Sequence, residues 1–130
     1  MLDSSPAPSP DEIAAAPPDV LTLMLFEGAV RFGRRARHAI DAGRMAEGAE
    51  LVSRVRAIVR QLDASLNHDA GEISGHLAAI YDYLLRRLAV AVEEADALDE
   101  VVADLQELAL TWSAVVSGRA VEGEPAAAAR

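Results

Sequence analysis

The chain contains no proline between Pro18 and Pro125, and this gap constrains its fold more than any other feature. Proline interrupts helices, and the gap shows no alternation of apolar and polar residues at the period of a β-strand. It therefore predicts consecutive helices, with breaks at residues 41–43, at residues 67–71 and near residues 95–96. Connections this short make neighbouring helices antiparallel. We expect an all-α fold, an antiparallel four-helix bundle with helices at about residues 18–40, 44–66, 72–94 and 97–117.

The two ends of the chain differ from this central region in composition. Residues 1–17 are rich in proline and are expected to form a flexible segment, with a candidate short helix opened by the capping pattern at residues 9–12 (SPDE). Gly118 suits the left-handed residue that ends a helix. The alanine-rich residues 118–130 are expected to form a disordered tail. The bundle is therefore expected to span residues 18–117.

The charge balance and the absence of cysteine exclude several classes of function. The 130 residues carry 21 acidic and 12 basic side chains, all arginine, for a formal net charge of −9, so nucleic acid is not an expected partner. Without cysteine the chain has no thiolate nucleophile, disulfide or cysteine-bound metal. No secretion signal and no apolar run of membrane-spanning length are present, so we expect a cytoplasmic protein without membrane insertion.

Three of the four expected helices carry one apolar stripe each, as bundle cores require. In the second helix, Val55 and Val59 belong to a stripe that fills an arc of about 120°. The first helix is different, because its apolar arc is about 220° wide and one core is not expected to cover it all. Smaller surplus strips lie on the third and fourth helices.

Surplus apolar surface of this kind indicates a protein partner or an oligomer. We therefore predict a binding surface at the residues of these strips: Leu23, Phe26, Val30, Tyr83, Val90 and Leu110. An alternative stays open for the strip on the first helix, since Leu2 or Ile13 of the N-terminal segment can lie over it.

The sequence holds no pattern for catalysis, a metal or a cofactor. Carboxylate metal sites in bundles need Glu-x-x-His on two helices, and the nearest approach is Glu72 with His76. Nucleophile elbows, phosphate-binding loops and dinucleotide fingerprints are missing. We expect a protein that is not an enzyme, with no catalytic residue, no bound metal and no cofactor.

Four arginines near the end of the first helix form a basic cluster. An anion site is one interpretation, but residues 96–117 carry five acids and no base, so pairing within the chain is favoured. The cluster comprises Arg31, Arg34, Arg35 and Arg37.

Three passages of the sequence resemble the FliS-type flagellar secretion chaperones, which bind flagellin. They are residues 21–29 (LTLMLFEGA), residues 61–67 (QLDASLN) and the third helix from GEI at residues 71–73 to IYDYLLRRL at residues 80–88. Trp112 stands where this family tends to have a tryptophan. The similarity runs in order from about residue 18 to residue 117. It departs from the family pattern at Phe26-Glu27, where Tyr-Asp is usual, and in having no tyrosine before Tyr81.

The resemblance implies a cytosolic chaperone built as an antiparallel four-helix bundle. Such a chaperone binds the C-terminal segment of flagellin, prevents premature polymerisation and assists delivery to the flagellar type III export gate. The N-terminal segment of the family is thought to cover part of the flagellin site. The alternative is a helical adaptor or dimerisation module with another protein partner, and the oligomeric state stays open.

Overall fold

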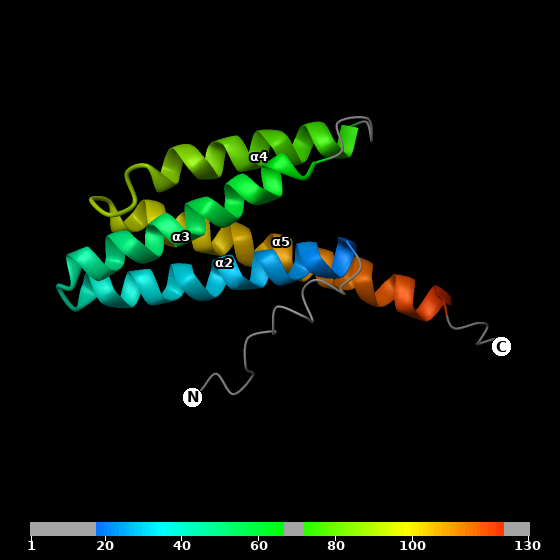
Figure 1. Cartoon of the computed structure of the whole chain (residues 1–130), viewed down its shortest axis with the longest axis horizontal. Coiled ribbons are helices and arrows are strands. Elements are labelled where there is room, and N and C mark those ends of the chain that lie inside the picture. The colour runs from blue at the N-terminus through cyan, green and yellow to red at the C-terminus, as the bar shows by residue number, and fades with distance from the viewer. Residues whose placement is uncertain (1–17, 67–71, 124–130) are drawn as a thin grey trace.

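The computed structural model describes residues 18–66 and 72–123 of the chain. These residues form four α-helices and no β-strand: α2 (Pro18–Asp41), α3 (Met45–Ala64), α4 (Glu72–Leu88) and α5 (Ala95–Gly123). Successive helices run in opposite directions (Figure 1). The predicted all-α class and helical bundle are confirmed. The expected N-terminal segment at residues 1–17, with its short helix, lies outside the described residues, as do residues 124–130 of the expected tail.

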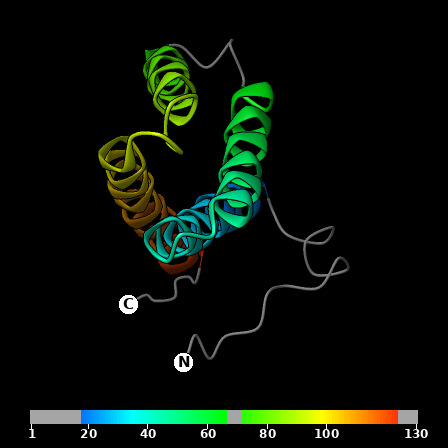
Figure 2. The same cartoon turned by 90° about the vertical axis from the view of Figure 1, so that its left-hand side faces the viewer.

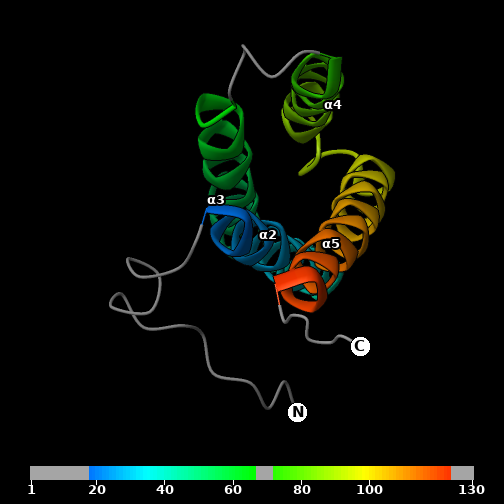
Figure 3. The same ribbon diagram turned by 90° about the vertical axis from the view of Figure 1, so that its right-hand side faces the viewer.

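The four helices form a ring in chain order. α2 contacts α3 on one side and α5 on the other, and α4 contacts the same two helices. The end views show α2 and α4 across the bundle from each other (Figure 2, Figure 3). The contact between α4 and α5 is the smallest of the four. α4 is therefore the helix least covered by its neighbours.

The turn between α2 and α3 shows why the first helix ends where the sequence predicts. Gly43 has a φ of +81°, in the left-handed region that glycine adopts without steric cost. The backbone N–H groups of Ala42 and Arg44 donate to the carbonyls of His38 and Ala39, at 3.0 and 2.9 Å. These bonds satisfy the last carbonyls of α2, as in a glycine-terminated helix. The break predicted at residues 41–43 is confirmed.

Two helix ends differ from the predicted bounds. α4 ends at Leu88 instead of residue 94, because the N–H groups of Val90 and Ala91 donate to carbonyls three residues earlier, at 3.2 Å, in a tighter turn. This turn keeps Ala91 buried while the chain reverses toward α5. α5 continues through Gly118 to Gly123, past the predicted end at residue 117. Among the described glycines Gly43 alone has a positive φ, so Gly118 does not terminate its helix.

A cluster of three aromatic rings joins α2, α4 and α5 in the core. The ring centroid of Phe26 lies 6.5 Å from that of Tyr81 and 6.0 Å from that of Trp112. The contact with Trp112 is edge to face, a favoured geometry for aromatic pairs. The indole Nε1–H of Trp112 donates to the backbone carbonyl of Asp19 at 2.9 Å. One side chain of α5 thus holds the N-terminal half of α2, by packing on Phe26 and by a hydrogen bond to Asp19 in the first turn.

The prediction that Phe26 and Val30 belong to an exposed strip is wrong. Their side chains are 0% and 7% exposed and are part of the core cluster. The physical reason is that α2 packs against two helices, α3 and α5, and buries a separate part of its wide apolar arc against each. The stripe predicted on the second helix is confirmed, since Val55 and Val59 are fully buried.

Two glycines allow these close helix contacts. A Cβ atom added to Gly33 of α2 would lie 2.6 Å from Cγ2 of Val102 on α5. A Cβ atom added to Gly48 of α3 would lie 2.6 Å from Cγ1 of Ile40 on α2. Both distances are below van der Waals contact, so any larger residue forces the helices apart. Glycine is required here for helix packing and not for a turn.

We predict that Gly33→Ala lowers the free energy of unfolding by about 1–3 kcal/mol, because the added methyl group overpacks the contact with Val102. Gly75→Ala is the matched control. Nothing lies within 4 Å of its added Cβ, so it should raise stability by up to about 1 kcal/mol through helix propensity. Urea denaturation followed by circular dichroism measures both. Equal effects of the two substitutions would contradict the proposed close contact.

Candidate functional site

The six residues predicted to bind a partner do not form one surface. Phe26 and Val30 are in the core, and Leu23 and Val90 are half-buried, on α2 and in the turn after α4. The exposed members are two: Tyr83 of α4, which is 37% exposed, and Leu110 of α5, which is 66% exposed. Each of these two lines a different groove beside α5.

The first groove, here the α4/α5 groove, lies between the two helices that share the smallest contact. It has a volume of about 480 Å³. Its apolar lining includes the side chains of Ile80 and Tyr83 from α4 and of Leu108 from α5, and two carboxylates of α5 border it. The full lining is Ala79, Ile80, Tyr83, Asp104, Glu107, Leu108 and Thr111.

A polar network at the border of this groove holds Tyr83 in place. The hydroxyl of Tyr83 donates a hydrogen bond to the carboxylate of Glu100, which also accepts one from Nε of Arg87 at 2.8 Å. These two bonds lower the pKa of Glu100. The hydrogen bond to Glu100 raises the pKa of Tyr83. The hydroxyl of Tyr83 therefore faces Glu100 at the border of the groove, and its ring is partly exposed.

The carboxylate of Asp104, which also lies at this groove, is in a less favourable environment than that of Glu100. Burial, together with the charges of Glu100 and Glu107, raises the pKa of Asp104. Removal from water and like charges both disfavour the ionised form of an acid. The negative charge of Asp104 at the border of the α4/α5 groove is therefore not balanced by a nearby positive charge.

The second groove, here the α2/α5 groove, has the opposite charge on its border. It has a volume of about 430 Å³ and shares no lining residue with the first. Arg31 and Arg34 of α2 line it, and Nη2 of Arg34 donates to Oε1 of Gln106 at 2.6 Å. The full lining is Glu27, Val30, Arg31, Arg34, Gln106, Ala109, Leu110 and Ser113.

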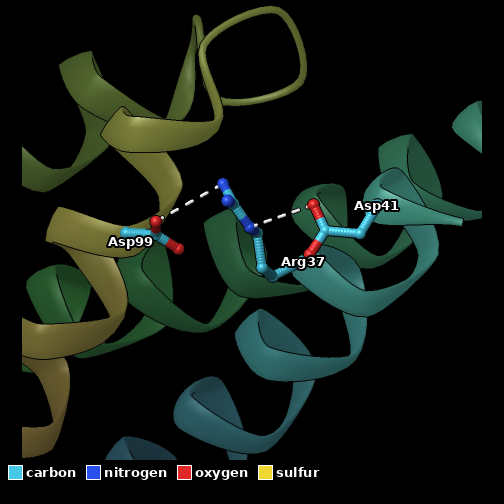
Figure 4. Close-up of polar contacts among 3 residues, drawn as sticks. All are labelled: Arg37, Asp41 and Asp99. Carbon is cyan, nitrogen blue, oxygen red and sulfur yellow. Dashed lines mark ion pairs between the residues drawn. The ribbon is translucent and has the colours of Figure 1, made fainter.

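Pairing of the basic cluster with acids of α5 is confirmed for one arginine. The guanidinium of Arg37 lies 3.3 Å from a carboxylate oxygen of Asp41 and 3.4 Å from one of Asp99 on α5, as Figure 4 shows. Arg35 instead lies over the ring of Phe32, 5.6 Å from its centroid, a cation–π contact. The cluster is therefore divided between an ion pair, an aromatic face and the α2/α5 groove.

The described residues form neither a metal site nor a membrane-spanning helix. No three histidine, aspartate or glutamate side chains of that part gather as a metal site would need. Glu72 and His76, the nearest sequence approach to such a site, are both exposed on α4. None of the helices, as far as the structure describes them, is long and apolar enough to cross a membrane.

Comparison with known proteins gives one consistent family. The sequence profile of the family described as flagellar protein FliS matches residues 7–119. The chain belongs to the FliS family. A flagellar secretion chaperone of Salmonella typhimurium is 35% identical over 107 residues, 79% of this chain and 79% of the relative. One from Bacillus subtilis is 36% identical over 81 residues, 62% of this chain and 60% of the relative. The chaperone FliSB of Pseudomonas aeruginosa is 29% identical over 107 residues, 80% of this chain and 85% of the relative.

The passages that resemble the FliS family meet inside the bundle. Phe26 comes from the first passage, Tyr81 from the third, and both belong to the aromatic cluster with Trp112. Leu66, from the second passage, lines a hollow of about 220 Å³ together with Tyr81 and Trp112. The FliS resemblance therefore traces residues that hold the helices together. The exposed groove residues Glu27, Ala79 and Tyr83 also belong to these passages.

Sequence reasoning missed the charged borders of both grooves. Asp104 and Glu107 were assigned to a general pairing surface on the last helix, and Arg31 and Arg34 to the same pairing. One signal in the sequence could have indicated the acidic border. On the last helix the acidic Glu107 stands next to the apolar Leu108, and on the third helix Tyr83 belongs to a surplus apolar strip. What the sequence lacked was the order of helices around the bundle, which brings the two together.

We predict that Asp104→Asn raises the free energy of unfolding at pH 7, by less than about 1 kcal/mol. A raised pKa in the folded state means that ionised Asp104 opposes folding above that pKa. The difference from the unchanged protein should therefore vanish as the pH falls below the ordinary value of 3.8. Urea denaturation at several pH values measures it.

The matched control for this prediction is Asp99→Asn, which removes the ion pair with Arg37 and should not raise stability. A destabilised Asp104→Asn protein at pH 7 would show that the carboxylate is stabilised by its neighbours, contrary to the assigned repulsion.

Proposed function

We propose that this protein is a cytoplasmic export chaperone that binds the C-terminal segment of flagellin. Binding keeps the segment from polymerising prematurely, and the complex is delivered to the flagellar type III export gate. The proposal is supported by membership of the FliS family and by relatives named flagellar secretion chaperones. It assigns no catalysis and no cofactor to the chain.

The α4/α5 groove is the observation that carries the proposal. An amphipathic segment binds by placing its apolar face into a groove between helices, and this groove has an apolar lining with Tyr83 at its border. Tyrosine is frequent among residues that dominate binding energy, because its ring adds apolar contact area and loses few rotamers. Because the hydroxyl of Tyr83 already bonds to Glu100, little further ordering is needed when a ligand arrives.

The charges of the groove favour a particular kind of ligand. Asp104 and Glu107 line it, and the pKa of Asp104 is raised by burial and by its acidic neighbours. A lysine or arginine beside the apolar face of the bound segment would relieve this repulsion. We therefore expect the flagellin segment to place a basic residue near Asp104.

The other predicted contacts have different roles in this proposal. Phe26 supports the bundle and makes no direct contact with flagellin unless the helices move, because it is fully buried. Val30 also supports the bundle, and its small exposed part faces the α2/α5 groove and not the α4/α5 groove. Leu23 and Val90 are half-buried and are proposed as peripheral contacts. Leu110 lines the other groove and is considered separately.

We predict that Tyr83→Asp lowers the affinity for the C-terminal segment of the cognate flagellin roughly 30-fold or more, as loss of about 2 kcal/mol at a binding hot spot requires. Isothermal titration calorimetry measures the affinity. Tyr83 is exposed, so circular dichroism should show an unchanged bundle.

Ile73→Asp is the matched control, since Ile73 is also exposed on α4 but lines neither groove. It should bind the flagellin segment as the unchanged protein does. Equal losses in both variants would remove the α4/α5 groove from the proposal. Absence of any complex at micromolar concentrations would instead favour a helical adaptor with another protein partner.

A further inference from the structure

The α2/α5 groove is a second apolar surface that the proposed flagellin site does not use. It lies on the other side of α5, where that helix runs beside α2 (Figure 3). Val30 and Ala109 are nearly buried in it, and Leu110 stands 66% exposed at its border. Of the large apolar side chains of the described residues, only Ile73 is as exposed as Leu110. The groove therefore combines a fixed apolar floor with one projecting leucine.

The arginines of this groove, like Arg35, Arg56 and Arg60 among the described residues, have no carboxylate within ion-pair distance. Five arginines elsewhere lie within ion-pair distance of carboxylates: Arg37, Arg44, Arg54, Arg86 and Arg87. The two groove arginines do not. Arg34 donates to the neutral amide of Gln106, and Arg31 has neither an ion pair nor a hydrogen bond to the described residues. Glu27 is the one acidic residue of the lining.

The α5 side of the groove adds no charge. Its lining residues there, Gln106, Ala109, Leu110 and Ser113, are all neutral. Positive charge therefore lies along α2, and apolar surface lies along α5. The groove extends about two helical turns along each helix, or about 10 Å, from the spacing of its lining residues.

We propose that the α2/α5 groove binds a short acidic amphipathic helix of a second protein partner. Leucine-type side chains of that helix pack on Leu110 and the floor at Val30, and its carboxylates pair with Arg31 and Arg34. The charges select this occupant over a symmetric second copy, because a two-fold contact through the same patch places these arginines near their own equivalents. The net charge of −9 likewise disfavours nucleic acid.

The test uses the full chain and three synthetic helical peptides of about 14 residues, long enough to cover the groove. Each has leucine along one face, bordered by glutamate, glutamine or lysine. Fluorescence anisotropy of labelled peptide measures affinity. We predict that the glutamate peptide binds at least tenfold more tightly than the glutamine peptide. The lysine peptide, which the acids of the α4/α5 groove favour, should bind with an affinity that Leu110→Asp leaves unchanged.

Two variants locate the binding in the groove. Arg31→Gln with Arg34→Gln should reduce the affinity for the glutamate peptide to that for the glutamine peptide. Leu110→Asp should reduce it tenfold or more, whereas the matched control Ile73→Asp, equally exposed at 67%, should leave it unchanged. Equal affinities for the glutamate and glutamine peptides, no binding of the glutamate peptide below millimolar concentration, or an unchanged Leu110→Asp variant would each overturn the proposal.

Two other occupants, a second copy of the chain and flagellin, are separated by two further measurements. A dimer in sedimentation velocity that Leu110→Asp dissociates would assign the groove to a second copy and overturn the proposal. Displacement of the glutamate peptide by the flagellin segment would assign the groove to flagellin and would also overturn the proposal. If the unchanged protein binds the glutamate peptide but does not bind the flagellin segment, only the proposed function is contradicted.

Discussion

The packing of α2 against α5 is the contact on which the rest of the bundle depends. Gly33 lets the helices approach until a Cβ would meet Val102, and Phe26 packs edge to face on Trp112. The indole of Trp112 also bonds to the first turn of α2. This contact fixes how α5 is rotated about its axis. Because of that rotation, one side of α5 borders α4, while another borders the arginines of α2.

Much of the fold could be predicted from the sequence because its signals are local. The absence of proline between Pro18 and Pro125, the turn at Gly43 and the stripe containing Val55 are each signals carried by neighbouring residues alone. The end of α4 could not be predicted in this way. Its last turn tightens so that Ala91 can enter the core, and that requirement comes from the packing of other helices.

The candidate site was only partly predictable for a related reason. A helical wheel shows how wide an apolar arc is, but not how many neighbours will cover it, so it predicts an exposed Phe26 where the structure buries that side chain. Tyr83 and Leu110 were found because their strips exceed what a core requires. Their separation into two grooves depends on the order of helices around the ring, which no local pattern encodes.

The two grooves divide the charge of the molecule between them. Asp104 and Glu107 border one, and Arg31 and Arg34 border the other, although both grooves share α5 as a wall. Complementary charge contributes more to the choice of partner than to affinity, which comes from apolar contact. A single helix thus separates two surfaces of opposite charge, which favour ligands of opposite charge.

The small contact between α4 and α5 has a consequence for motion within the folded state. Local opening begins where fewest contacts must break, so the amide protons of α4 would exchange with deuterated solvent before those of α2. A polypeptide bound across α4 and α5 would stabilise the state in which the two helices are packed together, and so it would slow hydrogen exchange in α4. Loading of the protein would be visible as rigidity in α4 even where no atom changes its average position.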